Sequence, residues 1–478
     1  MPGARPLITF GTPDMQKYAP LFLVLASLPL AAISCGGSTT QQSNPQQTDG
    51  GTEGGVTPEG GVQESGTEAG HDAGGTQACT PTNGTLAPGY PAMHGPMPQV
   101  TYQGGGVIVN PEVVTVTFPG DTLANQLEAF DDGITQTCYW DTIRAGYCES
   151  SGSNCVGRGT VPAKPHVEMT TAPASSYTDT ASGGASTMAT YIQQQVSSGA
   201  FPAPTANTIY VLWFPASTTI TLDGQASCQV FGGYHNSTTV TPPGGSNMVV
   251  SYAVVPRCQN SIDYLTFAAS HEIAEASTDP HVGENQIGFY LPMNNLDDLA
   301  WDLLGGGEIG DLCVDLTGLN QDQTKATGPN GTTWTVQRLW SNANAAAGLD
   351  PCVPMASNET YFNIAPPAGM GTIQLAVGAT ATYTATAYSS GPMNAWPILA
   401  EDIAQLQQQQ PYLNISMTIG GAPASTAKNG DQITVSVTLT KQPPQLQGAS
   451  FAGMPYLLIS ALSNNGPIHY WPGLVVAQ

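Results

Sequence analysis

The residues best suited to chemistry stand close together at 271–275. His271 and Glu275 are four residues apart, so on a helix their side chains lie one above the other on the same face. Glu272 follows His271 directly on that helix. An imidazole and a carboxylate in this arrangement can hold a metal ion, and the neighbouring carboxylate can take a proton from water bound to it. The stretch therefore predicts a metal centre with a general base beside it.

The order His-Glu-x-x-Glu matches the zinc-peptidase helix His-Glu-x-x-His, with Glu275 in the second histidine position. By that layout His271 and Glu275 are metal ligands and Glu272 is the catalytic base. One histidine with carboxylates is a harder ligand set than two histidines. Zinc is the first candidate, and manganese or calcium is conceivable. The alternative interpretation is an ordinary polar helix face with a histidine beside two solvated carboxylates.

A catalytic zinc ion needs three protein ligands and an open position for water. Candidates for the third ligand are Glu308 and Asp311, in the acidic turn at 305–313, and His281, ten residues beyond His271. Hydrolysis also requires a group that stabilises the oxyanion. Four residues are candidates for that role: Tyr264, Tyr290, His235 and Arg338.

Alternating strands and helices must position these residues. Segments 107–109, 113–118, 166–169, 209–215, 248–256 and 334–342 are rich in β-branched and aromatic residues and predict strands. Segments 123–145, 188–196 and 262–278 have helical spacing. Asn260 or Ser261 can cap the last helix, and Pro280 ends it. The order predicts an α/β fold with a mixed sheet and a zincin-like active helix over residues 79–354.

From residue 355 the pattern changes to alternating strands between Gly, Pro and Asn turns. Residues 355–478 therefore predict an all-β sandwich resembling immunoglobulin-type modules, with an accessory role.

Residues 1–35 carry the features of a secretory signal: a short positive start, an apolar run and a small-residue exit. The end of this segment resembles a bacterial lipobox, which implies lipidation of Cys35. Residues 36–78 are rich in Gly, Ser, Thr and Gln and predict a disordered tether. We expect an exported protein, lipid-anchored in the cell envelope, such as the outer membrane, or extracellular. A lipid anchor would be its only contact with a membrane.

The charge and the cysteines agree with export. The net charge of −24 argues against nucleic acid as a partner. Without Cys35, eight cysteines remain, an even set that predicts up to four disulfides. Proximity along the chain suggests three pairs: Cys148–Cys155, Cys228–Cys258 and Cys313–Cys352.

Three segments together resemble a known family: 270–280 (SHEIAEASTDP), 308–313 (EIGDLC) and 336–342 (VQRLWSN) before Cys352. The chain is similar to secreted bacterial and fungal proteins that are grouped as metallopeptidases on the helix motif. These are similar in turn to the plant phosphate-induced, Exordium-type proteins. The resemblance covers roughly residues 100–353. It favours the acidic turn as the source of the third ligand, because a Cys313–Cys352 bridge would hold that turn rigid. Within the turn, Asp311 is slightly preferred over Glu308.

Two functions follow as hypotheses. The first is a surface-anchored, metal-dependent endopeptidase, with zinc as the expected ion and a protein or peptide as its substrate. The second is a non-catalytic extracellular lipoprotein, an adhesion or ligand-binding module with a structural metal or none. Recruitment of both Glu308 and Asp311 would favour the second, because a structural metal leaves no open position.

Overall fold

The computed structural model describes residues 79, 84–150, 152–181, 183–292, 295–316, 320–355, 359–446, 451–462 and 466–478. These residues belong to one compact unit. The predicted signal segment, Cys35 and the whole of the predicted tether (36–78) lie outside them. The limits proposed above for the domains stay predictions.

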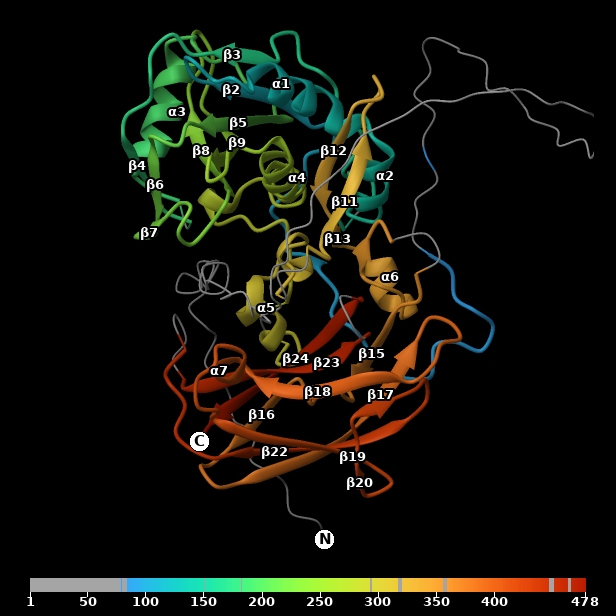
Figure 1. The fold of residues 1–478 in the computed structure, drawn as a ribbon. Coiled ribbons are helices and arrows are strands. Elements are labelled where there is room, and N and C mark those ends of the chain that lie inside the picture. Colours follow the sequence, from blue (N-terminus) through green and yellow to red (C-terminus); the bar gives the residue numbers. More distant parts are fainter. Residues whose placement is uncertain are drawn as a thin grey trace, which may run out of the picture. The chain divides into compact units, whose positions relative to one another are not determined.

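The first part of the described chain is built on a five-stranded mixed sheet (Figure 1). In spatial order its strands are β3 (His166–Glu168), β2 (Glu112–Thr117), β5 (Thr208–Phe214), β9 (Met248–Pro256) and β8 (Tyr234–Val240). The first four run parallel, and β8 pairs antiparallel with β9 at one edge.

Helices cover both faces of this sheet because β5 is apolar on both sides. Ile209, Val211 and Trp213 join the core that includes helices α1 (Ala124–Gly133) and α4 (Ile262–Thr278). The alternate side chains of β5, including Tyr210, join a second core with helix α3 (Thr187–Ser197). The period of two in a strand sends successive residues to opposite faces, so a nearly continuous apolar strand needs cover on both sides.

The expected helix 123–145 is interrupted. Helix α1 ends at Gly133, a 3₁₀ turn (Ile134–Gln136) follows, and α2 (Cys138–Ile143) begins afresh. Thr137 is extended and its hydroxyl accepts the N–H of Trp140 at 3.1 Å, which caps α2 as a new helix. The strand expected at 107–109 is also absent. Ile108 is instead hydrogen-bonded singly to the carbonyl of Ser277.

Several small elements complete this part. One is a three-stranded sheet, β4–β6–β7 (Ser176–Asp179, Thr219–Leu222, Gln225–Ala226). The others are three two-stranded ladders: β1–β10 (Thr101–Tyr102, Phe289–Tyr290), β11–β12 (Gln323–Thr327, Thr333–Gln337) and β13–β14 (Leu339–Trp340, Cys352–Val353). Short helices α5 (Leu299–Gly305) and α6 (Asn342–Ala347) and the 3₁₀ turns Val282–Glu284 and Asp311–Cys313 lie between them in sequence.

Residues 362–477 form two five-stranded sheets with a sandwich-like arrangement. One sheet has the order β15 (Phe362–Ala365), β17 (Thr380–Ser389), β22 (Gln432–Leu439), β19 (Leu413–Ile419) and β20 (Ala422–Pro423). The other has the order β16 (Thr372–Leu375), β24 (Ile468–Ala477), β23 (Gly453–Ala461), β18 (Trp396–Asp402) and β21 (Thr426–Ala427), and the short helix α7 (Ile403–Leu406) follows β18. Alternate residues along β22 are buried, as expected for sheets packed on one face.

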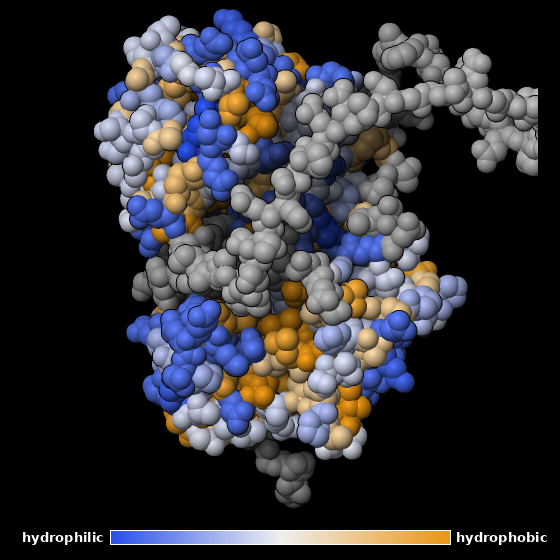
Figure 2. Space-filling view, viewed as in Figure 1, coloured by the Kyte–Doolittle hydropathy of each residue, from blue (hydrophilic) through white to orange (hydrophobic). Residues whose placement is uncertain are grey.

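Strands therefore predominate over helices in the described chain. The face seen in Figure 2 is mostly hydrophilic, and its largest hydrophobic area lies over the sandwich sheets. Within the described residues, no helix combines the length and apolar character that crossing a bilayer requires.

Candidate functional site

Helix α4 carries the predicted metal motif and has the bounds expected from the sequence, Ile262–Thr278. Ser261 is its N-cap residue, although its hydroxyl makes no capping bond. Leu265, Ala269 and Ile273 are buried in the core beneath the main sheet. The opposite side of the helix packs against β12, so α4 is enclosed along most of its length. A helix fixed on two sides holds its side chains in defined positions.

His271 and Glu275 face each other as their spacing predicts. Nε2 of His271 lies 2.9 Å from Oε2 of Glu275. The other oxygen, Oε1, accepts the backbone N–H groups of Gly310 at 3.0 Å and Asp311 at 3.3 Å. A Cβ on Gly310 would lie 2.6 Å from Nδ1 of His271 and 2.8 Å from Oε1 of Glu275. The glycine of the acidic turn is therefore required for the turn to approach the helix so closely.

Gln337 orients the imidazole of His271. Nδ1 of His271 is 2.7 Å from Oε1 of Gln337, and Nε2 of Gln337 donates to the carbonyl of Gly310 at 2.8 Å. The backbone N–H of Gln337 donates to Oγ of Ser270. With Nδ1–H donated to the amide oxygen, Nε2 of His271 faces the carboxylates, and it can present its lone pair to a metal ion once its own proton is lost. Gln337 was not predicted as a site residue from the sequence.

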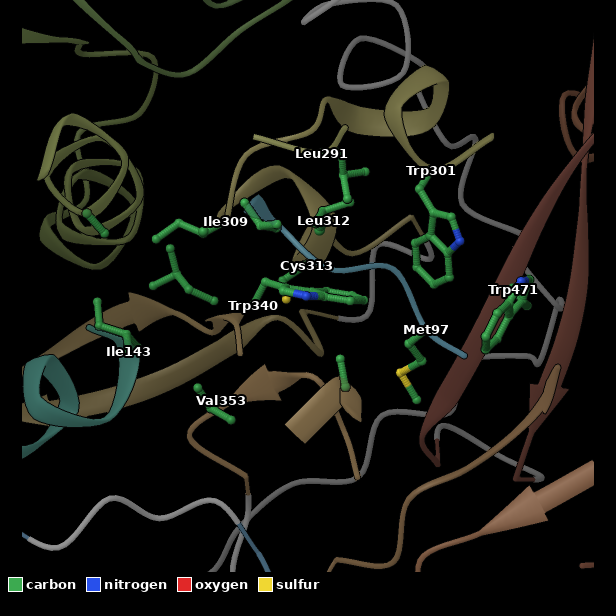
Figure 3. Packing of buried hydrophobic residues seen from close by; sticks show 14 of the residues in the cluster. Met97, Ile143, Leu291, Trp301, Ile309, Leu312, Cys313, Trp340, Val353 and Trp471 are labelled. Carbon is green, nitrogen blue, oxygen red and sulfur yellow. The ribbon is translucent and has the colours of Figure 1, made fainter. Parts of the chain in front are cut away.

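The acidic turn brings both of its carboxylates to the helix. Oδ1 of Asp311 lies 3.6 Å from Nε2 of His271, and Glu308 is 2% exposed. Ile309 and Leu312, between and after these acids, point into the hydrophobic core around Trp340, as Figure 3 shows. The turn is thus held by apolar anchors that alternate with its acids.

The Cys313–Cys352 disulfide ties this turn to β14. It is one of the three pairs expected from the sequence; Cys148–Cys155 and Cys228–Cys258 are also present, and Cys79–Cys138 is the fourth. Four disulfides are characteristic of proteins outside the reducing cytosol.

His235 joins the cluster from the edge strand β8. Tyr234 belongs to the core on the α3 side of the sheet, so strand alternation turns His235 to the α4 side. Its Nδ1 lies 3.5 Å from Oε2 of Glu275 and 3.8 Å from Oε2 of Glu272. Its Nε2 lies 3.7 Å from Oε2 of Glu308. From the sequence, His235 was predicted only as a candidate oxyanion donor.

Other candidates have different partners. Nδ1 of His281 is 2.8 Å from the carbonyl of Gly105, and His281 is in neither of the metal-competent sets described below. The hydroxyl of Tyr290 donates to Asp302 at 2.7 Å. Arg338 pairs with Asp350 at 2.5 Å and lines a separate cavity of about 330 Å³.

The cluster is strongly acidic and nearly closed. The Lys and Arg ion pairs of the described residues all involve other acids. Burial alone would lower the pKa of His271, but the charges of Glu275 and Glu272 raise it well above its usual value. Burial likewise opposes charge on His235, yet hydrogen bonds and charges from the same two acids raise its pKa to about 10.

The carboxylates divide into two kinds. Burial alone would raise the pKa of Glu275, but the two histidines hold it below its ordinary value. Burial and the charge of Glu275 raise the pKa values of Glu308 and Asp311 well above their usual range. Burial also raises the pKa of Glu272. One carboxylate is thus charged between two imidazoles, and the others are held in an environment that disfavours their ionisation.

Two sets of side chains within the described residues have ligand atoms close enough to hold a metal ion. One contains His271, Glu272 and Glu275, and the other contains His235, Glu275 and Glu308. Imidazole nitrogen with carboxylate oxygen is a donor set suited to zinc or manganese. Three buried atoms at the cluster have no hydrogen-bond partner: Nε2 of His235, Oε2 of Glu308 and Oδ2 of Asp311. A cation is the kind of group that would satisfy them.

The fold and the cluster define a disulfide-bonded, sheet-rich extracellular or cell-surface protein with a buried histidine–carboxylate site. No protein-family profile matches this chain, and no curated protein matches it.

Two solved structures from Streptococcus sanguinis are similar to parts of the chain. One is an SrpA adhesin mutant, with 8% identity over 26% of this chain and 60% of that chain, at a TM-score of 0.18. The other is the sialic acid binding region of the SK1 adhesin bound to 3'sLn, with 12% identity over 55% of this chain and 64% of that chain, at a TM-score of 0.16. At these scores neither likeness bears on the function of this chain.

Proposed function

We propose that the protein is an extracellular metal-dependent hydrolase of the zinc-peptidase type, acting on proteins or peptides. The observation that carries the proposal is the arrangement on α4. His271 and Glu275 face each other at 2.9 Å, and Glu272 lies beside them on the same helix. We also propose that the chain is related to the secreted metallopeptidase-like proteins that it resembles and that α4 is a zincin-like helix. The sandwich would then be an immunoglobulin-like module, and Cys35 would carry a lipid anchor.

In this function His271 and Glu275 would hold the ion with Asp311, or with Glu308 as the alternative third ligand. Asp311 lies 3.6 Å from Nε2 of His271, although it is in neither metal-competent set. A bound divalent ion would polarise the scissile carbonyl and acidify the attacking water. Gln337 keeps the ligating nitrogen of His271 directed at the site.

Glu272 acts as the general base. A carboxylate oxygen of Glu272 takes a proton from the attacking water, whose oxygen bonds to the carbonyl carbon. As the amide C–N bond breaks, Glu272 passes that proton to the leaving nitrogen. The side chains of His271 and Glu272 are 13% and 7% exposed, against 1% for Glu275, so the base lies on the more open side of the cluster.

Tyr264 is the candidate that remains for the oxyanion. Tyr290 and Arg338 are engaged elsewhere, and His235 faces the carboxylates. Tyr264 is half-buried on α4, close enough to Glu272 for that charge to act with burial in raising its pKa.

A second candidate function has its own observation. Both Glu308 and Asp311 reach the cluster, and most of its side chains are at most 7% exposed. A site saturated with protein ligands suits a structural metal in a non-catalytic adhesion or ligand-binding module.

The test uses the full-length protein, wild type beside Glu272→Gln, with metal content by elemental analysis and cleavage of casein as readouts. Glu168→Gln is the matched control, since it neutralises an exposed carboxylate on β3. We expect equal metal in all three proteins and at least a ~100-fold loss of cleavage in Glu272→Gln alone. Metal without cleavage in the wild type would favour the structural role. Absence of metal would overturn both functions of the cluster.

A further inference from the structure

The two histidines of the cluster face the same carboxylate, that of Glu275, but belong to different sets of possible metal ligands. Both face its Oε2, Nε2 of His271 at 2.9 Å and Nδ1 of His235 at 3.5 Å. They nevertheless belong to different metal-competent sets, and Glu275 is the residue that the sets share. Two ligands of a single ion with bonds of about 2.0–2.2 Å are at most about 4.4 Å apart. This arrangement indicates two neighbouring positions for a cation.

The second position has its own unsatisfied atoms. Nε2 of His235 and Oε2 of Glu308 are buried, lack a hydrogen-bond partner and lie 3.7 Å apart. That separation is too long for a hydrogen bond. It is close to the ~3.4 Å expected between two ligands on one tetrahedral ion. His235 and Glu308 are 8% and 2% exposed, so water does not reach them freely.

Gln337 orients His271 through the nitrogen that faces away from the first position. Nδ1 of His271 is directed to Gln337, which leaves Nε2 for the first position. Metal-binding histidines typically donate their second N–H to a carboxylate or an amide oxygen. His235 presents its two ring nitrogens to different acids, Nδ1 to Glu275 at 3.5 Å and Nε2 to Glu308 at 3.7 Å.

The charge of the cluster also favours two ions. Glu272, Glu275, Asp279, Glu308 and Asp311 are all at least nine-tenths buried. Metal binding releases the protons of such acids, and two divalent ions offset four negative charges where one offsets two. Buried carboxylates are stable only when they are paired, protonated or bound to metal.

We propose that the cluster is a dinuclear site, in which a second divalent cation is held by the imidazole of His235, Oε2 of Glu308 and the shared carboxylate of Glu275. The first ion is held by His271 and Glu275 with Asp311. This inference rests on the proposed metal-dependent function and deepens it. In paired sites of this kind the ions stand about 3.5–4 Å apart and clamp both the attacking and the leaving groups of a substrate.

The test loads the full-length protein with Mn²⁺, removes free metal by dialysis, and measures bound manganese and its electron paramagnetic resonance. We expect two ions per chain and an exchange-coupled spectrum in the wild type. Glu308→Gln and His235→Gln should each retain one ion with a mononuclear spectrum. Glu168→Gln, which makes the same chemical change at an exposed acid, should retain two coupled ions.

The outcomes separate this inference from the proposed function. One ion and a mononuclear spectrum in the wild type would overturn the dinuclear site and leave the single-ion hydrolase intact. Two uncoupled ions, or two coupled ions in both Glu308→Gln and His235→Gln, would also overturn it. No bound ion would overturn both. Near-ultraviolet circular dichroism of each variant establishes that the loss of one ion is not loss of the fold.

Discussion

Buried acids in the two parts of the described chain show how burial differs from function. In the sandwich, Asp402 is 0% exposed, and its carboxylate accepts the backbone N–H groups of Gln405 at 2.8 Å, Tyr412 at 2.6 Å and Leu413 at 2.8 Å. In the α4 cluster, Glu308 and Asp311 are similarly buried, but each has an oxygen with no hydrogen-bond partner. The hydrogen bonds of Asp402 are complete within the fold, whereas Glu308 and Asp311 each keep one oxygen that a bound group could satisfy.

Two histidines differ in pKa, although Nε2 of each lacks a hydrogen-bond partner. His469 contacts the rings of Tyr361 and Phe362 in the sandwich, and burial lowers its pKa to about 4. In the cluster, the carboxylates raise the pKa of His235 to about 10 despite burial. A neutral histidine against aromatic rings serves packing, whereas we expect one among carboxylates to exchange its proton for a metal ion.

The largest effect should come from metal binding. Since only the folded cluster assembles these ligands, metal at ~1,000 times its Kd should stabilise the wild type by about 4 kcal/mol. Glu275→Gln should abolish that response, and Asp402→Asn should leave it unchanged. Urea unfolding with EDTA and with Zn²⁺ or Mn²⁺ measures it. A wild type equally stable with and without metal would contradict the contrast between the two acids.

Asp402→Ala should lower the free energy of unfolding by about 3 kcal/mol, because three backbone N–H groups lose their acceptor in a buried place. EDTA should not change the size of this loss. Asp402→Asn retains an acceptor oxygen and should lose less. The same urea titrations serve as the measurement, and a loss that depended on metal would show that the acid is not an independent structural element.

His469 gives a pH prediction. Its folded-state pKa of about 4 lies below the ordinary 6.5, so the unfolded chain binds the proton first as pH falls. The fold should therefore lose about 2 kcal/mol between pH 7 and pH 4.5 through this group. His469→Phe should remove that part of the pH dependence. Unfolding at both pH values, compared between variant and wild type, measures it; identical pH dependence would refute the assignment.

The helix and its motif could be predicted because their signals are local. Ser261 and Pro280 bracket α4, and the spacing of His271 and Glu275 places them on one face whatever surrounds the helix. The apolar strands β5 and β9 were equally readable from composition. Three disulfide pairs followed from proximity alone, whereas Cys79–Cys138 spans 59 residues and did not.

His235 and Gln337 could not be assigned because their roles depend on tertiary contacts. Strand β8 reads YHNSTTV, a polar sequence that does not look like a buried strand, and its burial comes from β9, α3 and α4. The scarcity of histidine, seven in 478 residues, was a usable signal for His235. Gln337 is 66 residues from His271, and nothing local links an amide on β12 to the helix.

The smallest predicted effect concerns this amide. Gln337→Ala removes the acceptor for Nδ1 of His271 and a donor to Gly310, so the imidazole is no longer oriented. Metal affinity should fall at least about tenfold, about 1.4 kcal/mol, with the fold retained. Competition with a chromophoric chelator measures the affinity. Gln323→Ala on β11 is the matched control, because Gln323 pairs with Gln337 across the hairpin but is exposed. Equal affinities in the two variants would mean that α4 orients His271 without the amide on β12.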